Sequence, residues 1–404
     1  MNENRLASTI GARGMIRVEE ALEHLFALSA PRGMERVSLR DAAGRVLAQN
    51  VRAGRDQPPF AASAMDGYAV RSQDVAPGAT LTVIGEAAAG HAWSGQIGPG
   101  EALRIFTGAP LPNGSDRVVI QEDVRRSSSS ITLGDRLDHS AHVRPAAADF
   151  SAGDMMKAPR RLRPQDIALL AAMNVPELDV YRKPTVAIIA TGDELVMPGE
   201  TPGPDQIIAS NTFGLAALVE ENGGTARLLP IARDTEDSLR MAFALAEGAD
   251  LIVTVGGASV GDHDLVGAVA DSMGLERNFY KIAMRPGKPL MAGRMQGSAM
   301  VGLPGNPVSA MVCGHVFILP MLRAMQGLGC TPAPRKNAPL GTDLPANGPR
   351  EHYMRARLED GALVPAGSQD SALLSVLAEA EALLIRPVDA PAARVGEMAE
   401  FITL

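Results

Sequence analysis

Aromatic residues and cysteines are scarce in this chain of 404 residues. Phe, Trp and Tyr together supply 3% of the sequence, and the only cysteines are Cys313 and Cys330. Two cysteines exclude a disulfide-rich scaffold, and their spacing fits no zinc-binding pattern. Apolar residues still reach 46% of the sequence, so aliphatic side chains must fill the cores. We expect both cysteines to be structural thiols.

The chain also lacks an excess of positive charge and any long uninterrupted apolar run. Its formal net charge of −8 argues against a protein built to neutralise nucleic-acid phosphates. No run reaches the ~18 apolar residues that span a bilayer, and the N-terminus has no signal-peptide core. We therefore expect a globular cytoplasmic protein with neither a nucleic-acid partner nor a membrane partner.

Length and local composition predict several domains, since one ordinary domain takes roughly 100 to 200 residues. Residues 15–31 have the apolar spacing of an amphipathic helix that ends at Pro31. Residues 51–145 are rich in Gly and Pro and contain short runs such as ATLTVIGEA, which predicts a β-rich domain. The segment 161–181 returns to helix, and we expect a new domain to begin at residue 182.

From residue 182 the pattern alternates regularly between apolar strands and helices. TVAIIA, DLIVTV and SAMVGL are predicted strands, and NTFGLAALVEENGG and NPVSAMVCGHVFILPMLRAM are predicted helices. This alternation predicts an α/β domain with a mostly parallel sheet covered on both faces. The short strands expected after residue 329 predict a small C-terminal β-domain.

Four chemically unusual loops follow predicted strands of the α/β domain. They are TGDEL (191–195), GGASVGDHD (256–264), RPGKP (285–289) and LPGNP (303–307). Ligands of open α/β sheets bind outside the carboxyl ends of the strands, so these loops are the candidate site.

The glycine-rich loop has two interpretations at this point. Gly256, Gly257 and Gly261 would let backbone amides approach a phosphate, and a helix beginning near Asp264 would add its positive end. The loop matches neither the GxxxxGK[ST] nor the GxGxxG pattern. Alternatively it is a tight turn in which Asp262 or Asp264 caps the helix.

Acidic side chains in these loops suggest a metal ion. A bound phosphate would be repelled by the carboxylates of Asp262, Asp264, Asp193 and Glu194. A Mg²⁺ ion between them would remove this repulsion, because it binds one or two carboxylates and phosphate oxygens at the same time. Capping in a turn between strand and helix is the alternative for Asp193 and Glu194.

Basic side chains surround the third loop. If the run before the loop is a strand, Lys281 and Arg285 share a face, and with Lys288 they could hold an oxyanion. A solvated basic edge is the alternative. In LPGNP, Asn306 is placed to cap a helix that begins at Pro307, with Ser309 in its first turn.

These loops, together with SAMDGYAV (63–70) and ALRIFTGAPLPNGSDRVVIQED (102–123), resemble the molybdopterin molybdenumtransferases, the molybdenum insertases of molybdenum cofactor biosynthesis. The resemblance runs in order over nearly the whole chain. It implies an elongated homodimer whose chains have four domains. These are a discontinuous linking domain (1–50 and 146–181), a β-rich inserted domain (51–145), an α/β molybdopterin-binding domain (182–329) and a C-terminal β-barrel (330–404).

The resemblance also implies an activity. Members of this family insert molybdate into adenylylated molybdopterin, use Mg²⁺ or a similar ion, and release AMP with the molybdenum cofactor. It implies an active site formed between the two subunits. It further suggests molybdopterin adenylyltransferase as a partner.

Residue by residue, the resemblance implies a site drawn from most of the chain. Arg285 stands where many members of the family have lysine. The expected catalytic acids are Asp264, Glu194, Asp66, Asp149 and Asp234, and the expected metal ligands are Asp264, Asp262 and Glu194. The expected substrate-binding residues are Thr191, Gly192, Ser210, Asn211, Gly256, Gly257, Ser259, Gly261, Lys281, Arg285, Lys288, Pro304, Gly305, Asn306 and Ser309. The expected molybdate-binding residues are Arg350, Arg355 and Ser371.

Two other functions compete with this one. An adenylyltransferase would consume ATP, but it would not need residues 51–145 or the last domain. A non-catalytic scaffold could use the same fold, but it would not need the acidic and basic loops.

Overall fold

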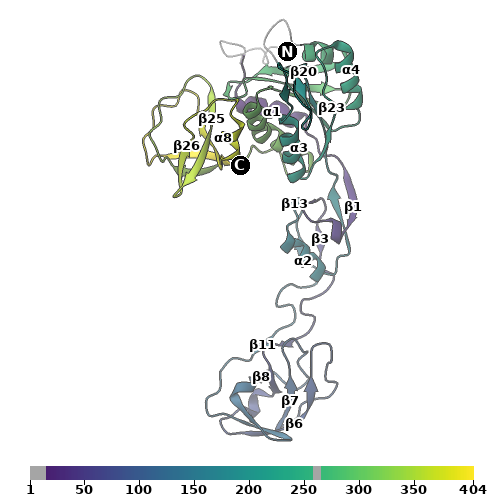
Figure 1. The fold of residues 1–404 in the computed structure, drawn as a ribbon. Helices are drawn as coiled ribbons and strands as arrows, with labels where there is room; N and C mark the ends of the chain where they lie inside the picture. The colour runs from purple at the N-terminus through teal and green to yellow at the C-terminus, as the bar shows by residue number, and fades with distance from the viewer. Residues whose placement is uncertain (1–14, 258–264) are drawn as a thin grey trace, which may run out of the picture.

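The chain folds into an elongated molecule with two bodies joined by a narrow arm (Figure 1). The computed structural model describes residues 15–257 and 265–404. The α/β domain and the C-terminal domain lie side by side at one end, and the β-rich inserted domain lies alone at the other.

A six-stranded mixed sheet forms the centre of the α/β domain. Its first four strands are parallel, and the last two run antiparallel to their neighbours. The strands, in sheet order, are β18 (Thr225–Leu228), β15 (Thr185–Ala190), β19 (Leu251–Val255), β23 (Ser298–Leu303), β22 (Pro289–Met295) and β20 (Leu275–Lys281). Strand β22 was not predicted, because PLMAGRM contains Pro, Gly and Arg and lacks a clear apolar run.

Helices cover both faces of this sheet. Successive side chains of β15 point to opposite faces, so Val186 and Ile188 pack in one core while Ala187 and Ile189 pack in the other. The first core contains residues of α3 (Asn211–Glu221), α6 (Pro307–Cys313) and α7 (Leu319–Met325); the second contains residues of α4 (Glu236–Leu245) and α5 (Leu265–Ser272). The predicted two-sided covering is therefore present.

The N-terminal helix α1 (Val18–Ala27) packs in the core of the α/β domain. Leu22 and Leu25 are buried together with β-strand and α7 residues of that domain. Residue Ile16 also bridges to Ile282 at the end of the sheet. This helix falls within residues 1–50 of the expected linking domain, and its buried residues belong to the α/β core and not to the arm core. An amphipathic pattern predicts that one face is buried and does not say against which partner.

One helical stretch, Pro307–Met325, is long and apolar enough to cross a membrane by length and composition. It consists of α6, a π-helical segment (Gly314–Ile318) and α7. Of its most apolar window, 78% is buried inside the protein. Cys313 lies in this buried stretch, whereas Cys330 is exposed.

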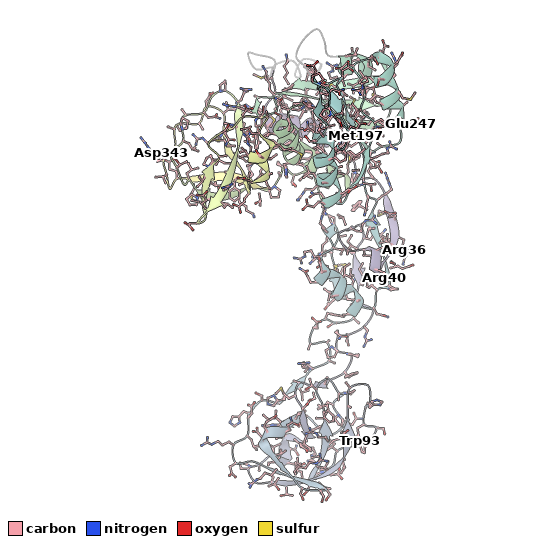
Figure 2. The ribbon with its side chains drawn as sticks, in the orientation of Figure 1. Arg36, Arg40, Trp93, Met197, Glu247 and Asp343 are labelled. Carbon is pink, nitrogen blue, oxygen red and sulfur yellow. The ribbon has the colours of Figure 1, made fainter. Side chains whose placement is uncertain are left out.

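The arm is a small four-stranded sheet with one helix packed on it. In sheet order its strands are β1 (Met34–Ser38), β14 (Glu177–Tyr181), β2 (Val46–Leu47) and β13 (Arg160–Arg161), and the helix is α2 (Pro164–Ala172). Figure 2 places Arg36 and Arg40 in this arm, between the α/β domain and the inserted domain. Two-stranded ladders continue toward the inserted domain: β3 (Val51–Arg52) with β12 (Met155–Met156), and β4 (Ala62–Ser63) with β11 (Val143–Arg144).

The inserted domain is a six-stranded sheet with a separate core on each face. The strands, in sheet order, are β8 (Arg117–Ile120), β5 (Gly67–Val70), β7 (Glu101–Ile105), β6 (Thr80–Ala87), β10 (Ser130–Leu133) and β9 (Val124–Arg126). Its Trp93 lies far from the α/β domain in Figure 2.

The C-terminal domain is a curved six-stranded sheet. Its strands are β21 (Met284–Arg285), β25 (Glu351–Glu359), β26 (Ala362–Pro365), β27 (Ala382–Arg386), β28 (Met398–Thr403) and β24 (Lys336–Pro339). Strand β21 comes from the α/β domain, and Tyr353, Leu383 and Ile402 join the α/β core. The two domains are therefore packed together.

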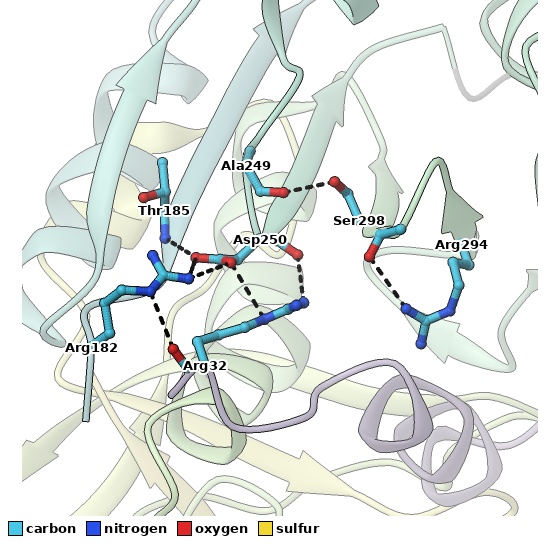
Figure 3. A network of polar contacts seen from close by, with 8 residues as sticks. Arg32, Arg182, Thr185, Ala249, Asp250, Arg294 and Ser298 are labelled. Carbon is cyan, nitrogen blue, oxygen red and sulfur yellow. Dashed lines mark hydrogen bonds and ion pairs between the residues drawn. The ribbon is translucent and has the colours of Figure 1, made fainter. Parts of the chain in front are cut away.

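Asp250 anchors both crossings of the chain between the arm and the α/β domain (Figure 3). Its carboxylate accepts hydrogen bonds from Arg182 Nη2 at 2.8 and 3.1 Å and from the backbone amide of Thr185 at 2.8 Å. Arg32 Nε lies 3.5 Å from the same carboxylate, and Arg32 Nη2 donates to the Asp250 carbonyl. Because Arg32 and Arg182 belong to the two crossings, one buried acid fixes where the arm leaves the body.

Candidate active site

A cavity of about 1140 Å³ opens at the carboxyl edge of the α/β sheet. Loops after β15, β19 and β23 form its walls, as the strand-end argument predicts. Eleven of the expected residues line it: Thr191, Gly192, Glu194, Ser210, Asn211, Asp234, Gly256, Gly257, Pro304, Gly305 and Asn306.

The glycine-rich wall requires glycine for steric reasons. Gly256 has φ +99°, and a Cβ there would lie 2.5 Å from the Thr191 carbonyl oxygen. A Cβ at Gly257 would lie 2.2 Å from Val266 Cγ2. The close approach of these loops leaves backbone, rather than side chains, facing the cavity beside helix α5.

Thr191 supplies a hydroxyl without a partner at this wall. The residue is 3% exposed, and its Oγ1 is buried with no hydrogen-bond partner among the described residues. A buried polar atom normally has a partner, so this hydroxyl is available to a ligand in the cavity.

Acidic side chains lie at and beside another wall of the cavity. Glu194 and Asp234 line the cavity, and Asp193 Oδ1 accepts a hydrogen bond from the Asp234 amide at 3.2 Å. Desolvation, followed by repulsion from Asp193 and Glu194, raises the pKa of Asp234 above its usual 3.8. Arg233 donates to two backbone carbonyls of the TGDEL loop, not to these carboxylates. The wall is therefore negatively charged.

The C-terminal domain closes the cavity through Ser371. Asn306 is at the N-cap position of α6, but its side chain makes no capping bond and donates to Ser371 Oγ at 3.1 Å. The Ser371 carbonyl accepts from the Val308 amide at 3.1 Å, and Ala372 lines the cavity. Capping alone therefore does not explain Asn306. Ser309 is buried in α6 and does not line the cavity.

The basic loop lies next to the cavity, and its geometry differs from the prediction. Strand β20 ends at Lys281, whereas Arg285 belongs to β21 and pairs with β25 of the C-terminal domain. Lys281 and Arg285 therefore do not share a face of one strand. Pro289 is the residue of this loop that lines the cavity, and the Arg285 side chain is exposed to solvent.

Arg355 is a fully buried guanidinium with unused donors. It is 0% exposed; its Nη2 donates to the carbonyls of Ser368 and Asp370, while Nε and Nη1 have no partner among the described residues. Burial lowers its pKa, the nearby Asp370 opposes this, and the positive charge of Arg285 adds to the lowering. A buried cation with two free donors beside Ser371 suits an oxyanion.

The two remaining acids, Asp66 and Asp149, do not line this cavity. Asp66 directly precedes β5 of the inserted domain, which lies at the opposite end of the molecule from the α/β domain (Figure 1), and Asp149 precedes Phe150 of the arm core. Asp66 Oδ1 accepts hydrogen bonds from the Thr107 amide at 2.8 Å and from the Thr107 hydroxyl at 2.9 Å, which lower its pKa. Its carboxylate therefore does not cap its own turn. Asp149 lines a separate cavity of about 620 Å³ with Arg55 and Arg144.

Some residues that line the cavity were not predicted from the sequence. Four of the predicted residues lie in a segment outside the described residues. Ile207 and Ile208 line the cavity although both are exposed, and no sequence signal marks an apolar pair as a cavity wall. Ser259, Gly261, Asp262 and Asp264 lie in the segment 258–264, which is outside the described residues.

Three family models match successive parts of the chain. Residues 16–174 match the MoeA N-terminal region (domain I and II), residues 187–324 match the probable molybdopterin binding domain, and residues 337–404 match the MoeA C-terminal region (domain IV).

Individual relatives are similar over most of the chain. A molybdopterin molybdenumtransferase of Nostoc sp. is 37% identical over 89% of this chain and 86% of its own length. One from Bacillus subtilis is 32% identical over 93% of this chain and 91% of its own length. The crystal structure of the molybdopterin biosynthesis moea protein from Pyrococcus horikosii has a TM-score of 0.81 and 31% identity, and it covers 96% of this chain and 99% of that chain.

Proposed function

Because the chain belongs to the molybdopterin molybdenumtransferase family, we propose that it inserts molybdate into adenylylated molybdopterin and releases AMP with the molybdenum cofactor. The observation that carries this proposal is the cavity at the sheet edge. It combines a backbone-lined glycine wall and the free Thr191 hydroxyl with the acids Glu194 and Asp234.

The glycine wall and Thr191 would hold the phosphates of the substrate. Backbone amides and the N-terminal end of α5 favour negative charge at the glycine wall. The Thr191 hydroxyl can donate a hydrogen bond to a phosphate oxygen. Water would then attack phosphorus in the phosphoanhydride, and AMP would leave as the P–O bond breaks. Asn211, whose side chain donates to the Gly305 carbonyl at 2.7 Å, keeps the opposite wall in place.

The acidic wall fits a divalent cation. Asp193 and Glu194 repel Asp234, and the neighbouring Arg233 donates to the carbonyls of Asp193 and Leu195 instead of to these carboxylates. A metal ion would relieve this repulsion. No group of three or more potential protein ligands converges within residues 15–257 and 265–404. Mg²⁺ does not need one, because it often takes one or two carboxylates and completes its shell with phosphate oxygens and water. When bound by Glu194, and by Asp262 and Asp264 as the sequence suggests, it would neutralise charge at the phosphate being cleaved.

Molybdate would dock between the two packed domains. Arg355 offers two buried unpaired donors, Arg350 precedes it on the same segment, and Ser371 lies at the cavity edge. Lys281, Arg285 and Lys288 add positive charge to this side of the site. The dianion would thereby be held next to the pterin while the opposite wall binds the phosphates.

The positions of Asp66 and Asp149 support an active site shared by two subunits of a homodimer. Neither acid lines the cavity of its own chain, and the inserted domain that contains Asp66 lies at the other end of the molecule (Figure 1). They would therefore act on a cavity only if a second chain presented it. Molybdopterin adenylyltransferase, the enzyme class that makes the adenylylated substrate, is the expected donor.

A matched pair of variants tests the phosphate-binding wall. Thr191 and Thr254 both have buried hydroxyls without partners, but only Thr191 lines the cavity. Thr191→Val should raise the KM for adenylylated molybdopterin about tenfold, the loss expected for a hydrogen bond to a charged group. Thr254→Val should leave this KM unchanged. Equal KM values for the two variants in an AMP-release assay would remove Thr191 from the site.

A further inference from the structure

We propose that the imidazole of His352 is an uncharged hydrogen-bonding group of the oxyanion site formed by Arg285 and Arg350. This role rests on the molybdate site proposed above and adds a residue to it. The ligand class is a tetrahedral dianion such as molybdate.

Strand pairing places His352 with these two arginines. In the parallel pair of β21 and β25, Arg285 lies opposite His352. Side chains at paired positions of adjacent strands point to the same face, and so do side chains two residues apart along one strand. Arg350 precedes His352 by two residues, immediately before β25 begins. The imidazole and both guanidinium groups therefore start from the same side of this strand pair.

The imidazole is buried and has a free nitrogen. His352 is 8% exposed, and its Nε2 has no hydrogen-bond partner among the described residues. Burying a polar atom without a partner costs free energy, so a partner is expected from outside the protein.

The neighbouring polar groups do not take this nitrogen. Arg386 lies opposite His352 on β27, but its guanidinium donates to the carbonyls of Pro345 and Pro391. Glu351 accepts the Tyr353 hydroxyl at 2.6 Å and pairs with Arg335. Glu351 and Tyr353 alternate with His352 along β25, so they face the other side. Arg386 shares the face of His352, but its donors are directed to the two proline carbonyls.

The charge around His352 matches an anion. Burial, followed by the positive charges of Arg285, Arg355 and Arg350, lowers the pKa of His352 to about 4. The imidazole is therefore neutral near pH 7, and the tautomer protonated at Nε2 can donate one hydrogen bond. Arg285 and Arg350 start from the same side of the strand pair as His352, and their positive charges attract a dianion.

A neutral donor would add selectivity that charge alone does not give. Arginines attract any anion, whereas the fixed Nε2–H direction favours an oxyanion that places an oxygen there. Sites built around a hydrogen bond discriminate strongly against ligands that cannot make it.

The test measures molybdate binding by isothermal titration calorimetry of the full-length protein. His352→Phe removes the donor, His352→Gln keeps a neutral donor, and Arg350→Ala removes a cation of the same site. His24→Phe is the matched control, because His24 lies on α1 and packs against the ring of Phe279 on β20, at a centroid distance of 5.8 Å. Thermal unfolding confirms that each variant is folded.

We expect His352→Phe to weaken molybdate binding about tenfold, the loss for one hydrogen bond to a charged group. His352→Gln should recover most of the affinity, and His24→Phe should change nothing. The KM for molybdate should rise in His352→Phe while the KM for adenylylated molybdopterin stays the same.

Two results would overturn the inference. The first is wild-type molybdate affinity in His352→Phe together with weakened affinity in Arg350→Ala, which leaves the proposed function intact. The second is an equal loss in His352→Phe and His352→Gln, which would make the imidazole a packing residue. Unchanged binding in both His352→Phe and Arg350→Ala would instead reject the molybdate site itself.

Discussion

At the scale of single residues, the negative charge of Asp234 lowers the stability of the folded protein at neutral pH. Its pKa is raised above 3.8 by desolvation and by the charges of Asp193 and Glu194. A raised pKa means that the folded state binds the proton more tightly than the unfolded state. Stability is therefore lost as the pH rises from about 4 through the raised pKa, and the penalty is complete at neutral pH.

Asp234→Asn should remove this penalty. We expect the variant to be at least as stable as the wild type at pH 7 and to lose the pH dependence that Asp234 contributes. Turnover should fall, because the acidic wall loses a carboxylate. Thermal unfolding at pH 4 and pH 7, combined with an AMP-release assay, measures both effects. A variant that is less stable than the wild type at pH 7 would contradict this account of the acidic wall.

At the scale of elements, helix α2 is tied to the arm by one buried acid. Burial of Asp166 opposes ionisation, but hydrogen bonds from Arg163 and Arg160 outweigh it and lower the pKa to about 2. The side chain is 3% exposed. Because its folded pKa lies below its unfolded value, Asp166 stabilises the arm at neutral pH, and this stability is lost as the pH falls from about 4 to about 2.

Asp166→Asn should therefore destabilise the arm by about 2 kcal/mol at pH 7 and remove its sensitivity to acid in that range. Hydrogen exchange of α2 and β13 in increasing urea, at pH 7 and pH 3, measures this effect. Glu177→Gln is the control, because its ion pair with Arg36 in the same arm is exposed and should contribute little. An equal effect of both substitutions would refute the assigned role of Asp166.

Secondary structure was predicted best from the sequence where a short, continuous apolar run marked a buried strand. TVAIIA and DLIVTV contain only buried apolar residues and small polar ones, so strands β15 and β19 were evident. Strand β22 was missed because it mixes Gly, Pro and Arg with apolar residues. The loop RPGKP was predicted as one unit, yet β21 within it pairs with another domain. Local patterns do not report pairings between distant segments.

The part of the candidate site that depends on strand order could be predicted from the sequence, and the part that depends on domain packing could not. Parallel strands bring their carboxyl ends to one edge, so TGDEL and LPGNP could be placed at one cavity from their order alone. Ser371 and the free donors of Arg355 depend on how two domains pack. Burial of a specific nitrogen, as in Arg355 and His352, has no signature in the sequence.

At the scale of the whole molecule, the extended shape separates acids that the family resemblance predicts to act in one site. Asp66 directly precedes β5 of the inserted domain, and Glu194 lines the cavity of the α/β domain. These two domains lie at opposite ends of the molecule (Figure 1). The Asp250 anchor fixes both crossings into the arm, so the separation is built into the fold. This separation supports the proposed site shared between two subunits.

Subunit mixing tests the shared site. Asp66→Asn and Glu194→Gln chains should each form nearly inactive homodimers. After unfolding and refolding together, half of the dimers should be mixed, and each mixed dimer should have one intact site. About a quarter of wild-type AMP release should return. No recovery of activity, with mixed dimers demonstrated by tagged chains, would place all the acids of one site in a single subunit.

The central claim is that this chain inserts molybdenum. The most direct measurement incubates the purified protein with adenylylated molybdopterin and Mg²⁺, with and without molybdate, and quantifies AMP and molybdenum cofactor. We predict that molybdate stimulates AMP release and that one molybdenum cofactor forms for each AMP. Absence of molybdenum cofactor in the presence of all three components would contradict the account.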